Sequence, residues 1–256
     1  MTSFSSNALA GRTAVVTGAG GGLGGAIVAQ LAAMGARVLS LDLRAPVADT
    51  AAGHHALACD IGREDDVAEA AHQWDALAGR CDILVNNAAV MPPPMPLADM
   101  VDADWDRVFA VNLKGAYFCA KHFGAAMRRA GRGSIVNLAS IAASVPNAIG
   151  AYGPSKAAVL ALTRQMAVEW GPLGLRANAV SPGLVRTPMS EPFYAQPANL
   201  AAREAVVASR RIGVPEDIAS VVGFLASDAS AYVNGQEITV DGGFMATPLM
   251  NIQKRD

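Results

Sequence analysis

The chain has 256 residues, of which 52% are hydrophobic and 16% are charged, and its formal net charge is −2. This composition predicts a folded protein with a sizeable core and excludes a disordered chain, while the small charge offers no footprint for nucleic acid or an anionic membrane surface. The apolar runs fall short of the ~20 residues that span a bilayer, and residues 1–12 lack the pattern of a signal peptide. We therefore expect a soluble cytoplasmic protein.

The first predicted element is a short strand over residues 13–17. A glycine-rich segment, 18–24, follows it, and residues 26–36 then carry apolar side chains at helical spacing. Strand, glycine turn and helix in this order are the context of a dinucleotide site. Glycine permits a tight turn and a close approach of the pyrophosphate, and the helix N-terminus offers unpaired N–H groups. The pattern favours a dinucleotide-binding turn over a flexible loop.

A second strand is predicted over residues 37–41 and ends at Asp42. A carboxylate about 20 residues beyond the glycines holds the ribose hydroxyls of adenosine and would repel a 2′-phosphate. Gly20 and Gly21 add no basic side chain that could receive such a phosphate, although Arg44 lies two residues beyond the carboxylate and could tolerate one. NAD is therefore favoured, and NADP stays open as the less favoured cofactor.

The alternation of strands and helices continues along the chain. Residues 45–54 are only weakly helical, so the second crossover helix is expected to be reduced. Residues 55–61 predict a third strand, and residues 63–77 predict an amphipathic helix whose acidic first turn suits the helix dipole. Residues 81–89 predict a fourth strand that breaks at two consecutive asparagines, which either form a turn or tie neighbouring strands together beside a ligand.

A long helix is predicted over residues 104–129, after the proline-rich loop 91–96. Asn112 lies inside this helix, and asparagine is a modest helix former. Its position hints at a backbone irregularity or a functional role, while solvent exposure is the commoner explanation.

The stretch from Ser140 to Lys156 carries the chemistry around which the chain is organised. Ser140 ends a predicted fifth strand, and Tyr152 and Lys156 lie four residues apart at the start of a helix, hence on one face of it. A free phenol has a pKa of about 10, and a cation beside it favours the phenolate, which would let Tyr152 act as a general acid/base. Because Tyr-x-x-x-Lys alone is a common accident on a helix, the other motifs decide its meaning.

The last third of the chain completes the pattern. Residues 175–188 predict a sixth strand that breaks at Pro182 and Gly183, 215–228 predict a helix and 236–243 predict a seventh strand. The segment from about 188 to 212 holds no clear strand and is expected to form a partly helical insertion over the carboxyl edge of the sheet. No linker divides the chain, so we predict a single domain over 1–256. Its fold class is α/β, a Rossmann-type doubly wound, seven-stranded parallel sheet with helices on both faces.

The cysteines and histidines do not predict a metal site. Paired CxxC spacing is missing among the cysteines, which are interpreted as reduced, buried thiols: Cys59, Cys81 and Cys119. No i,i+4 pair occurs among the histidines, which are interpreted as surface or helix residues: His54, His55, His72 and His122. A serine hydrolase is also excluded, because neither Ser140 nor Ser155 stands in GxSxG and no histidine is placed as its base.

Over nearly the whole chain these motifs resemble the short-chain dehydrogenase/reductase family, in its single-domain form with the TGxxxGxG turn. Each match alone would be weak, but their order and spacing together are specific. The matches are TGAGGGLG (17–24), Asp42, Asp60, NNAA (86–89), Asn112, Ser140, YGPSK (152–156), SPGLVRTP (181–188) and VDGG (240–243).

The resemblance implies roles for the matched residues. Tyr152 would be the catalytic acid/base and Ser140 would orient the substrate oxygen. Lys156 would lower the pKa of Tyr152 and hold the nicotinamide ribose, and Asn112 would hold a water in a proton relay to Lys156. Besides Tyr152 and Lys156, the cofactor would contact Gly18, Gly22, Leu23, Gly24, Asp42, Leu43, Asp60, Ile61, Asn87, Ala88, Ala89, Pro182, Gly183, Val185 and Thr187.

The resemblance also implies a homo-oligomer, a tetramer or a dimer, that pairs through the two long helices beginning near Asp104 and Tyr152. Two departures from the family pattern stand out. Ala89 replaces a glycine, which mildly crowds the cofactor site, and the interval from Ser140 to Tyr152 is one residue shorter than usual. We expect the catalytic geometry to survive, because a strand end and a helix start position both residues, and the substrate pocket to be reshaped.

The expected activity is reversible hydride transfer between NAD and a secondary alcohol or ketone. The candidate pocket wall is mostly apolar, which favours a small apolar or aromatic secondary alcohol or a cyclic diol over a phosphorylated or polycarboxylate substrate. A 3-oxoacyl-thioester or sugar-alcohol oxidoreductase stays open, as does a non-catalytic NAD-binding sensor or scaffold. The wall residues are Val90, Met91, Ile141, Ala142, Val145, Leu184, Met189, Phe193 and Tyr194.

Overall fold

A computed structural model describes residues 7–46 and 53–248, and within them one seven-stranded sheet has the strand order β3-β2-β1-β4-β5-β6-β7. Every neighbouring pair of strands is parallel, which confirms the predicted fold class. The strands are β1 (Thr13–Thr17), β2 (Arg37–Asp42), β3 (His55–Ala58), β4 (Ile83–Asn86), β5 (Gly133–Leu138), β6 (Leu175–Pro182) and β7 (Glu237–Val240).

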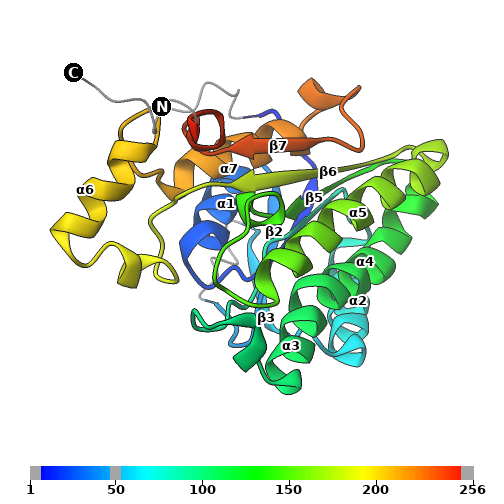
Figure 1. Ribbon diagram of the computed structural model, residues 1–256. Coiled ribbons are helices and arrows are strands. Elements are labelled where there is room, and N and C mark those ends of the chain that lie inside the picture. The colour runs from blue at the N-terminus through cyan, green and yellow to red at the C-terminus, as the bar shows by residue number, and fades with distance from the viewer. Residues whose placement is uncertain (1–6, 47–52, 249–256) are drawn as a thin grey trace.

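The central strands are buried on both faces because helices cover both sides of the sheet (Figure 1). Successive side chains of a strand point to opposite faces. Val16 therefore joins the core on one face, with Ile27 and Val222, while Val15 joins the core on the other, with Phe123. Short runs of β-branched and aliphatic residues suit strands in this position.

Helices α1 (Gly22–Ala33) and α7 (Pro215–Ala226) pack together on one face of the sheet. On the other face, α5 (Tyr152–Trp170), α4 (Ala116–Ala130) and α2 (Glu64–Ala78) lie side by side (Figure 1). Helix α6 (Pro197–Val206) projects from the edge of the sheet and lies within the segment from about 188 to 212 that was expected to be partly helical. No helix within 7–46 and 53–248 is long and apolar enough to cross a membrane.

The predicted long helix is interrupted where Asn112 lies. Helix α3 (Asp102–Phe109) passes into a π-helical turn, Ala110–Gly115, before α4 begins. Asn112 is only 2% exposed, so the interpretation as a backbone irregularity is confirmed and solvent exposure is wrong. Such π-turns occur frequently at functional sites.

The predicted third strand is too long. Strand β3 ends at Ala58, and residues 59–61 already belong to the turn before α2. Asp60 closes this turn, because its Oδ1 atom accepts a hydrogen bond of 2.9 Å from the amide of Gly62. The weakly helical segment predicted over 45–54 falls mostly on residues 47–52, which lie outside the described residues.

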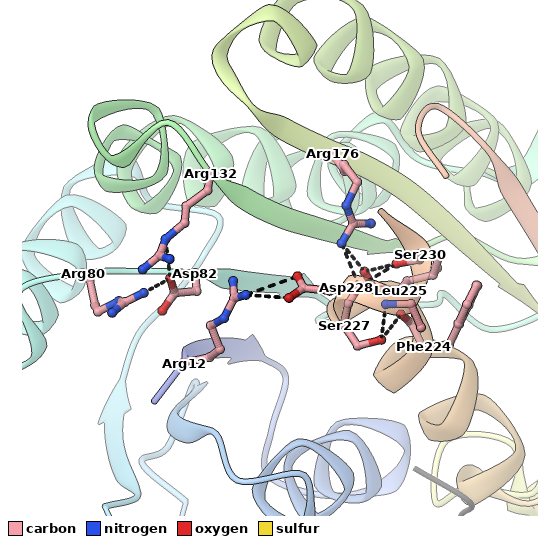
Figure 2. A network of polar contacts seen from close by, with 11 residues as sticks. Arg12, Arg80, Asp82, Arg132, Arg176, Phe224, Leu225, Ser227, Asp228 and Ser230 are labelled. Atoms are coloured by element: carbon pink, nitrogen blue, oxygen red, sulfur yellow. Dashed lines mark hydrogen bonds and ion pairs between the residues drawn. The ribbon is translucent and has the colours of Figure 1, made fainter. Parts of the chain in front are cut away.

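Ion pairs and backbone contacts stabilise the amino-terminal edge of the sheet (Figure 2). Asp82, which is 3% exposed, accepts hydrogen bonds from the amide of Thr13 at 2.9 Å and its hydroxyl at 3.2 Å, and it pairs with Arg80 and Arg132. Nearby, Arg12 pairs with Asp228 at 2.9 Å. At the opposite, carboxyl-terminal edge of the sheet, the strands end in loops.

Candidate active site

A cleft of about 1010 Å³ opens at the carboxyl ends of the parallel strands. Strand order reverses between β1 and β4, and ligands of such sheets bind in the crevice at this switch point. The cleft brings together the residues predicted to contact the cofactor, except Gly24, and three of the four predicted catalytic residues, Ser140, Tyr152 and Lys156. All nine residues predicted to form the pocket wall also line it.

The glycine turn has the shape that a dinucleotide needs. Gly18 has a φ of 65°, and a Cβ atom there would lie 2.7 Å from the Cα atom of Ala88. At Gly24, a Cβ atom would lie 2.0 Å from the carbonyl oxygen of Gly18, so this glycine allows α1 to approach the strand end. Among the described residues no side chain caps α1, and its first residues, Gly22 and Leu23, line the cleft. The turn therefore fits a pyrophosphate.

The paired asparagines at the end of β4 tie the strands together, as one of the two interpretations predicted. Asn87 donates hydrogen bonds from Nδ2 to the carbonyl oxygens of Thr17, at 2.9 Å, and Gly18, at 3.0 Å. Asn86 donates from Nδ2 to Oδ1 of Asn137 on β5 at 2.8 Å. The glycine turn is thus anchored to the centre of the sheet.

Asp42 places a carboxylate at the adenosine end of the cleft. Its Oδ2 atom accepts a hydrogen bond from the amide of Gly20 at 2.8 Å, and its Oδ1 atom accepts one from the amide of Leu43 at 2.7 Å. These bonds hold the carboxylate beside the turn. Arg44, the residue expected to tolerate a 2′-phosphate, does not line the cleft.

Tyr152 and Lys156 lie on the first turn and a half of α5, and the cationic side chain is the more deeply buried of the two. The ammonium nitrogen of Lys156 lies 5.7 Å from the centre of the Tyr152 ring and donates a hydrogen bond of 2.7 Å to the carbonyl oxygen of Leu138. Burial lowers the pKa of Lys156 to about 8. The lysine is therefore held by the end of β5, beside the phenol.

The pKa of Tyr152 differs in sign from the expectation. Burial is the largest influence and raises the pKa of the phenol, and a hydrogen bond with the Ser140 hydroxyl lowers it by less. In the protein alone the pKa of the phenol is therefore raised, because burial disfavours the phenolate. Ser140 nevertheless reaches Tyr152 despite the shortened loop, because it lies only two residues beyond the end of β5 at Leu138.

Asn112 lies behind the wall of the cleft, where it positions other groups. Its Oδ1 atom accepts a hydrogen bond of 2.8 Å from the amide of Val90, and its Nδ2 atom donates to the carbonyl of Val90 and to the hydroxyl of Ser155, each at 3.0 Å. Ser155 in turn donates to the carbonyl oxygen of Tyr152 at 2.7 Å. The role of Ser155 was missed, although it stands within the YGPSK motif.

The insertion after β6 brings Arg203 to the cleft, a residue that the sequence analysis did not single out. Its two ends meet in a parallel bridge between Val185 and Gly213, so the segment folds back over the cleft. Arg203 on α6 lines the cleft together with Phe193 and Tyr194. Arg186 does not line the cleft and instead pairs with Glu191 at 2.6 Å.

Comparison with known proteins agrees with this geometry. A family model described as enoyl-(acyl carrier protein) reductase matches residues 18–245. D-threitol dehydrogenase of Mycolicibacterium smegmatis is 38% identical over 92% of this chain and 94% of the relative. Cis-4-hydroxycyclohexanecarboxylate dehydrogenase of Sinomonas cyclohexanicum is 40% identical over 93% of this chain and 98% of the relative.

The chain is also similar to a solved structure from Beutenbergia cavernae, described as an NAD(P)-dependent gluconate 5-dehydrogenase and holding NADP at low occupancy. The TM-score is 0.88 at 38% identity, over 94% of this chain and 100% of the other. With the fold, the cleft and these relatives in agreement, the chain belongs to the short-chain dehydrogenase/reductase family. It is an oxidoreductase that uses a nicotinamide cofactor.

Proposed function

We propose that this protein is an NAD-dependent oxidoreductase that interconverts a secondary alcohol and its ketone. The observation that carries the proposal is the convergence of Ser140, Tyr152 and Lys156 on one cleft with the glycine turn. Relatives named as dehydrogenases of D-threitol and of a hydroxycyclohexanecarboxylate support the same reaction class. A non-catalytic sensor is disfavoured, because the four residues that the resemblance assigns to catalysis are all present in the sequence.

In the oxidative direction, the nicotinamide when bound supplies the hydride acceptor. Tyr152, as the phenolate, takes the proton of the substrate hydroxyl, and Ser140 holds the substrate oxygen by a hydrogen bond. In the reductive direction, Tyr152 gives the proton back to the carbonyl oxygen. With the oxidised cofactor bound, its positive charge would add to that of Lys156 and would favour the phenolate of Tyr152 against the burial that raises its pKa. Asn112 and Ser155 keep the start of α5 in register with the wall of the cleft.

NAD is the proposed cofactor because the carboxylate of Asp42 lies at the adenosine end of the cleft. The carboxylate of Asp42 is held beside the glycine turn, where it suits the ribose hydroxyls and opposes a 2′-phosphate. The arginine at position 44 lies outside the lining and does not compensate that charge.

The proposed substrate is a small apolar, aromatic or cyclic secondary alcohol or diol. The side of the cleft away from the glycine turn is lined mainly by apolar side chains, among them Val145, Leu184 and Met189. A sugar alcohol is the second candidate, favoured by the relative that is named for D-threitol.

We also propose that the protein is a cytoplasmic homo-oligomer, a tetramer or a dimer, that pairs through the helices after Asp104 and Tyr152. Apolar side chains stand out on these helices, with Val168 of α5 75% exposed and Tyr117 of α4 44% exposed. The three cysteines are free and buried, which suits a reducing compartment. Sedimentation of the purified protein tests the assembly, and a monomer at micromolar concentration would contradict it.

The experiment that tests the reaction is Tyr152→Phe. Removal of the phenolic oxygen takes away the acid/base group, so turnover of secondary alcohols should fall by at least about 10²–10⁴-fold. Binding of NADH, followed by its fluorescence, should change by less than about twofold. Tyr232→Phe is the matched control, since Tyr232 is fully exposed and lies outside the cleft. A Tyr152→Phe variant that keeps most of its rate would overturn the assignment.

A further inference from the structure

Arg203 stands on an aromatic platform in the cleft. The central carbon of its guanidinium lies 5.3 Å from the centre of the Phe193 ring and 5.7 Å from that of the Tyr194 ring. Tyr194 is only 4% exposed, so at least one ring of the platform is fixed by the surrounding protein. Contacts with two ring faces hold the cation in place without neutralising its charge.

This arginine lacks an anionic partner in the part of the chain that the structure describes. Two other arginines near the ends of the insertion have carboxylate partners. Arg186 donates two hydrogen bonds to Glu191, at 2.6 and 2.9 Å. Arg211 donates two to Asp217, at 2.6 and 2.8 Å. For Arg203, no ion pair and no hydrogen-bond acceptor is found among the described residues. A guanidinium has five N–H donors in a flat fork that matches a carboxylate, and this fork is available.

The distribution of charge in the cleft points to the same ligand chemistry. The acidic residues of the described lining are Asp42 and Asp60, which follow β2 and β3 and already accept hydrogen bonds from the amides of Gly20 and Gly62. On the substrate side, Arg203 lies beside the rings of Phe193 and Tyr194. The cations of the described lining are Arg63, Arg107, Lys156 and Arg203. A substrate with a negative group therefore meets attraction there and no opposing carboxylate.

We propose that Arg203 determines specificity by binding a carboxylate of the substrate. The preferred substrate is then a secondary alcohol, or the matching ketone, that carries one carboxylate on an otherwise apolar ring or chain. This inference rests on the proposed function and narrows it, because the apolar wall receives the carbon skeleton while Tyr152 receives the reacting oxygen. The carboxylate anchors the far end of the molecule and takes no part in proton or hydride transfer.

A binding experiment tests the proposal without turnover. The protein loaded with NADH is titrated with cyclohexanecarboxylate and with its uncharged amide, which have the same ring, and the heat of binding is followed. A hydrogen bond between a guanidinium and a carboxylate that is partly shielded from water should raise the affinity for the ligand by about 10–100-fold. We expect the wild type to bind the acid at least about tenfold more tightly than the amide, and Arg203→Gln to lose this difference while NADH affinity stays within about twofold.

Two further variants separate recognition from structure. Arg203→Lys keeps the charge without the fork and should show intermediate affinity for the acid. Arg37→Gln removes an exposed arginine outside the cleft and should leave both affinities unchanged. If Arg203→Gln weakened the amide and the acid equally, or if the wild type bound the acid no better than the amide, the proposal would be overturned, and Arg203 would serve only to fasten the insertion.

The same variants in turnover assays distinguish failure of this inference from failure of the proposed function. With a hydroxy acid and its neutral amide as substrates, Arg203→Gln should raise the KM for the acid about 10–100-fold, with kcat within about twofold, and leave the amide unaffected. Turnover of neutral alcohols without any preference for the acid contradicts the inference alone. Binding of the acid through Arg203 with no turnover of any alcohol supports the inference and contradicts the proposed reaction.

Discussion

The two sides of the cleft are built in different ways. On the cofactor side, backbone groups and strand ends do the positioning: the glycine turn follows β1, Asp42 ends β2, and Asn87 ties β4 to that turn. On the substrate side, the loop after β5 and the insertion after β6 supply side chains such as Val145 and Arg203. A cofactor shared by many enzymes needs only the first kind of construction, whereas the choice of substrate depends on the second.

This contrast predicts two kinds of mutational effect. A substitution on the cofactor side should alter cofactor binding and reduce the rate with every alcohol by a similar factor. A substitution on the substrate side, such as Arg203→Gln, should leave the cofactor bound and change the ranking of substrates.

Gly24→Ala should have the largest effect on the cofactor side. The added Cβ atom would meet the carbonyl oxygen of Gly18 at 2.0 Å, so α1 must move away from the strand end. We expect a loss of about 3 kcal/mol in the free energy of unfolding and at least about a tenfold loss of NADH affinity. Denaturant titration and NADH fluorescence measure the two quantities.

Gly25→Ala is the matched control for that variant. Its Cβ atom would have its nearest neighbour, the carbonyl oxygen of Ala19, at 4.0 Å. Because alanine favours the helix over glycine, stability should rise by up to about 1 kcal/mol, with NADH binding unchanged. Equal behaviour of the two variants would show that the close approach at Gly24 does not matter.

Asp42→Ala should shift cofactor preference by an intermediate amount. Loss of the carboxylate removes both a partner for the ribose hydroxyls and the repulsion of a 2′-phosphate. The ratio of NADH to NADPH affinity should fall by about tenfold or more, while the ranking of alcohol substrates is kept. Arg44→Gln should leave the ratio unchanged, because Arg44 lies outside the lining. A marked loss of NADPH binding in Arg44→Gln would show that this arginine does reach the cofactor.

A last prediction concerns the stability of the protein without cofactor as a function of pH. Burial lowers the pKa of Lys156 from 10.5 to about 8, so between these values the unfolded chain binds a proton that the folded protein does not. The free energy of unfolding should therefore rise with pH in this window, by at most about 1.4 kcal/mol per pH unit, and not change below it on account of this group. Relative to Lys156→Met, the wild type should gain stability from pH 8 to 10. A constant difference would contradict the shift.

Much of the cofactor side could be predicted because its signals are local. A short buried strand, a glycine turn and a helix follow one another within residues 13–36, and Asp42 directly ends the next strand. A backbone irregularity at Asn112 was one of the predicted alternatives for a similar reason, since a residue with modest helix propensity interrupts an otherwise regular pattern.

The features that escaped prediction depend on distant parts of the chain. Arg203 reaches the cleft only because the bridge between Val185 and Gly213 folds the insertion back, and no local pattern marks that bridge. Ser155 matters through its contact with Asn112, which lies 43 residues earlier. The sign of the pKa shift of Tyr152 depends on how deeply the phenol is buried, which sequence spacing alone does not show.

The most direct test of the central claim is titration of the purified protein with NADH and with NADPH, followed by a panel of secondary alcohols with the matching oxidised cofactor. The account predicts tighter binding of NADH, because of Asp42, and turnover of apolar or cyclic secondary alcohols, with acids preferred. Tight binding of NADH without turnover of any alcohol or ketone would contradict the proposed reaction, and tighter binding of NADPH would contradict the role given to Asp42.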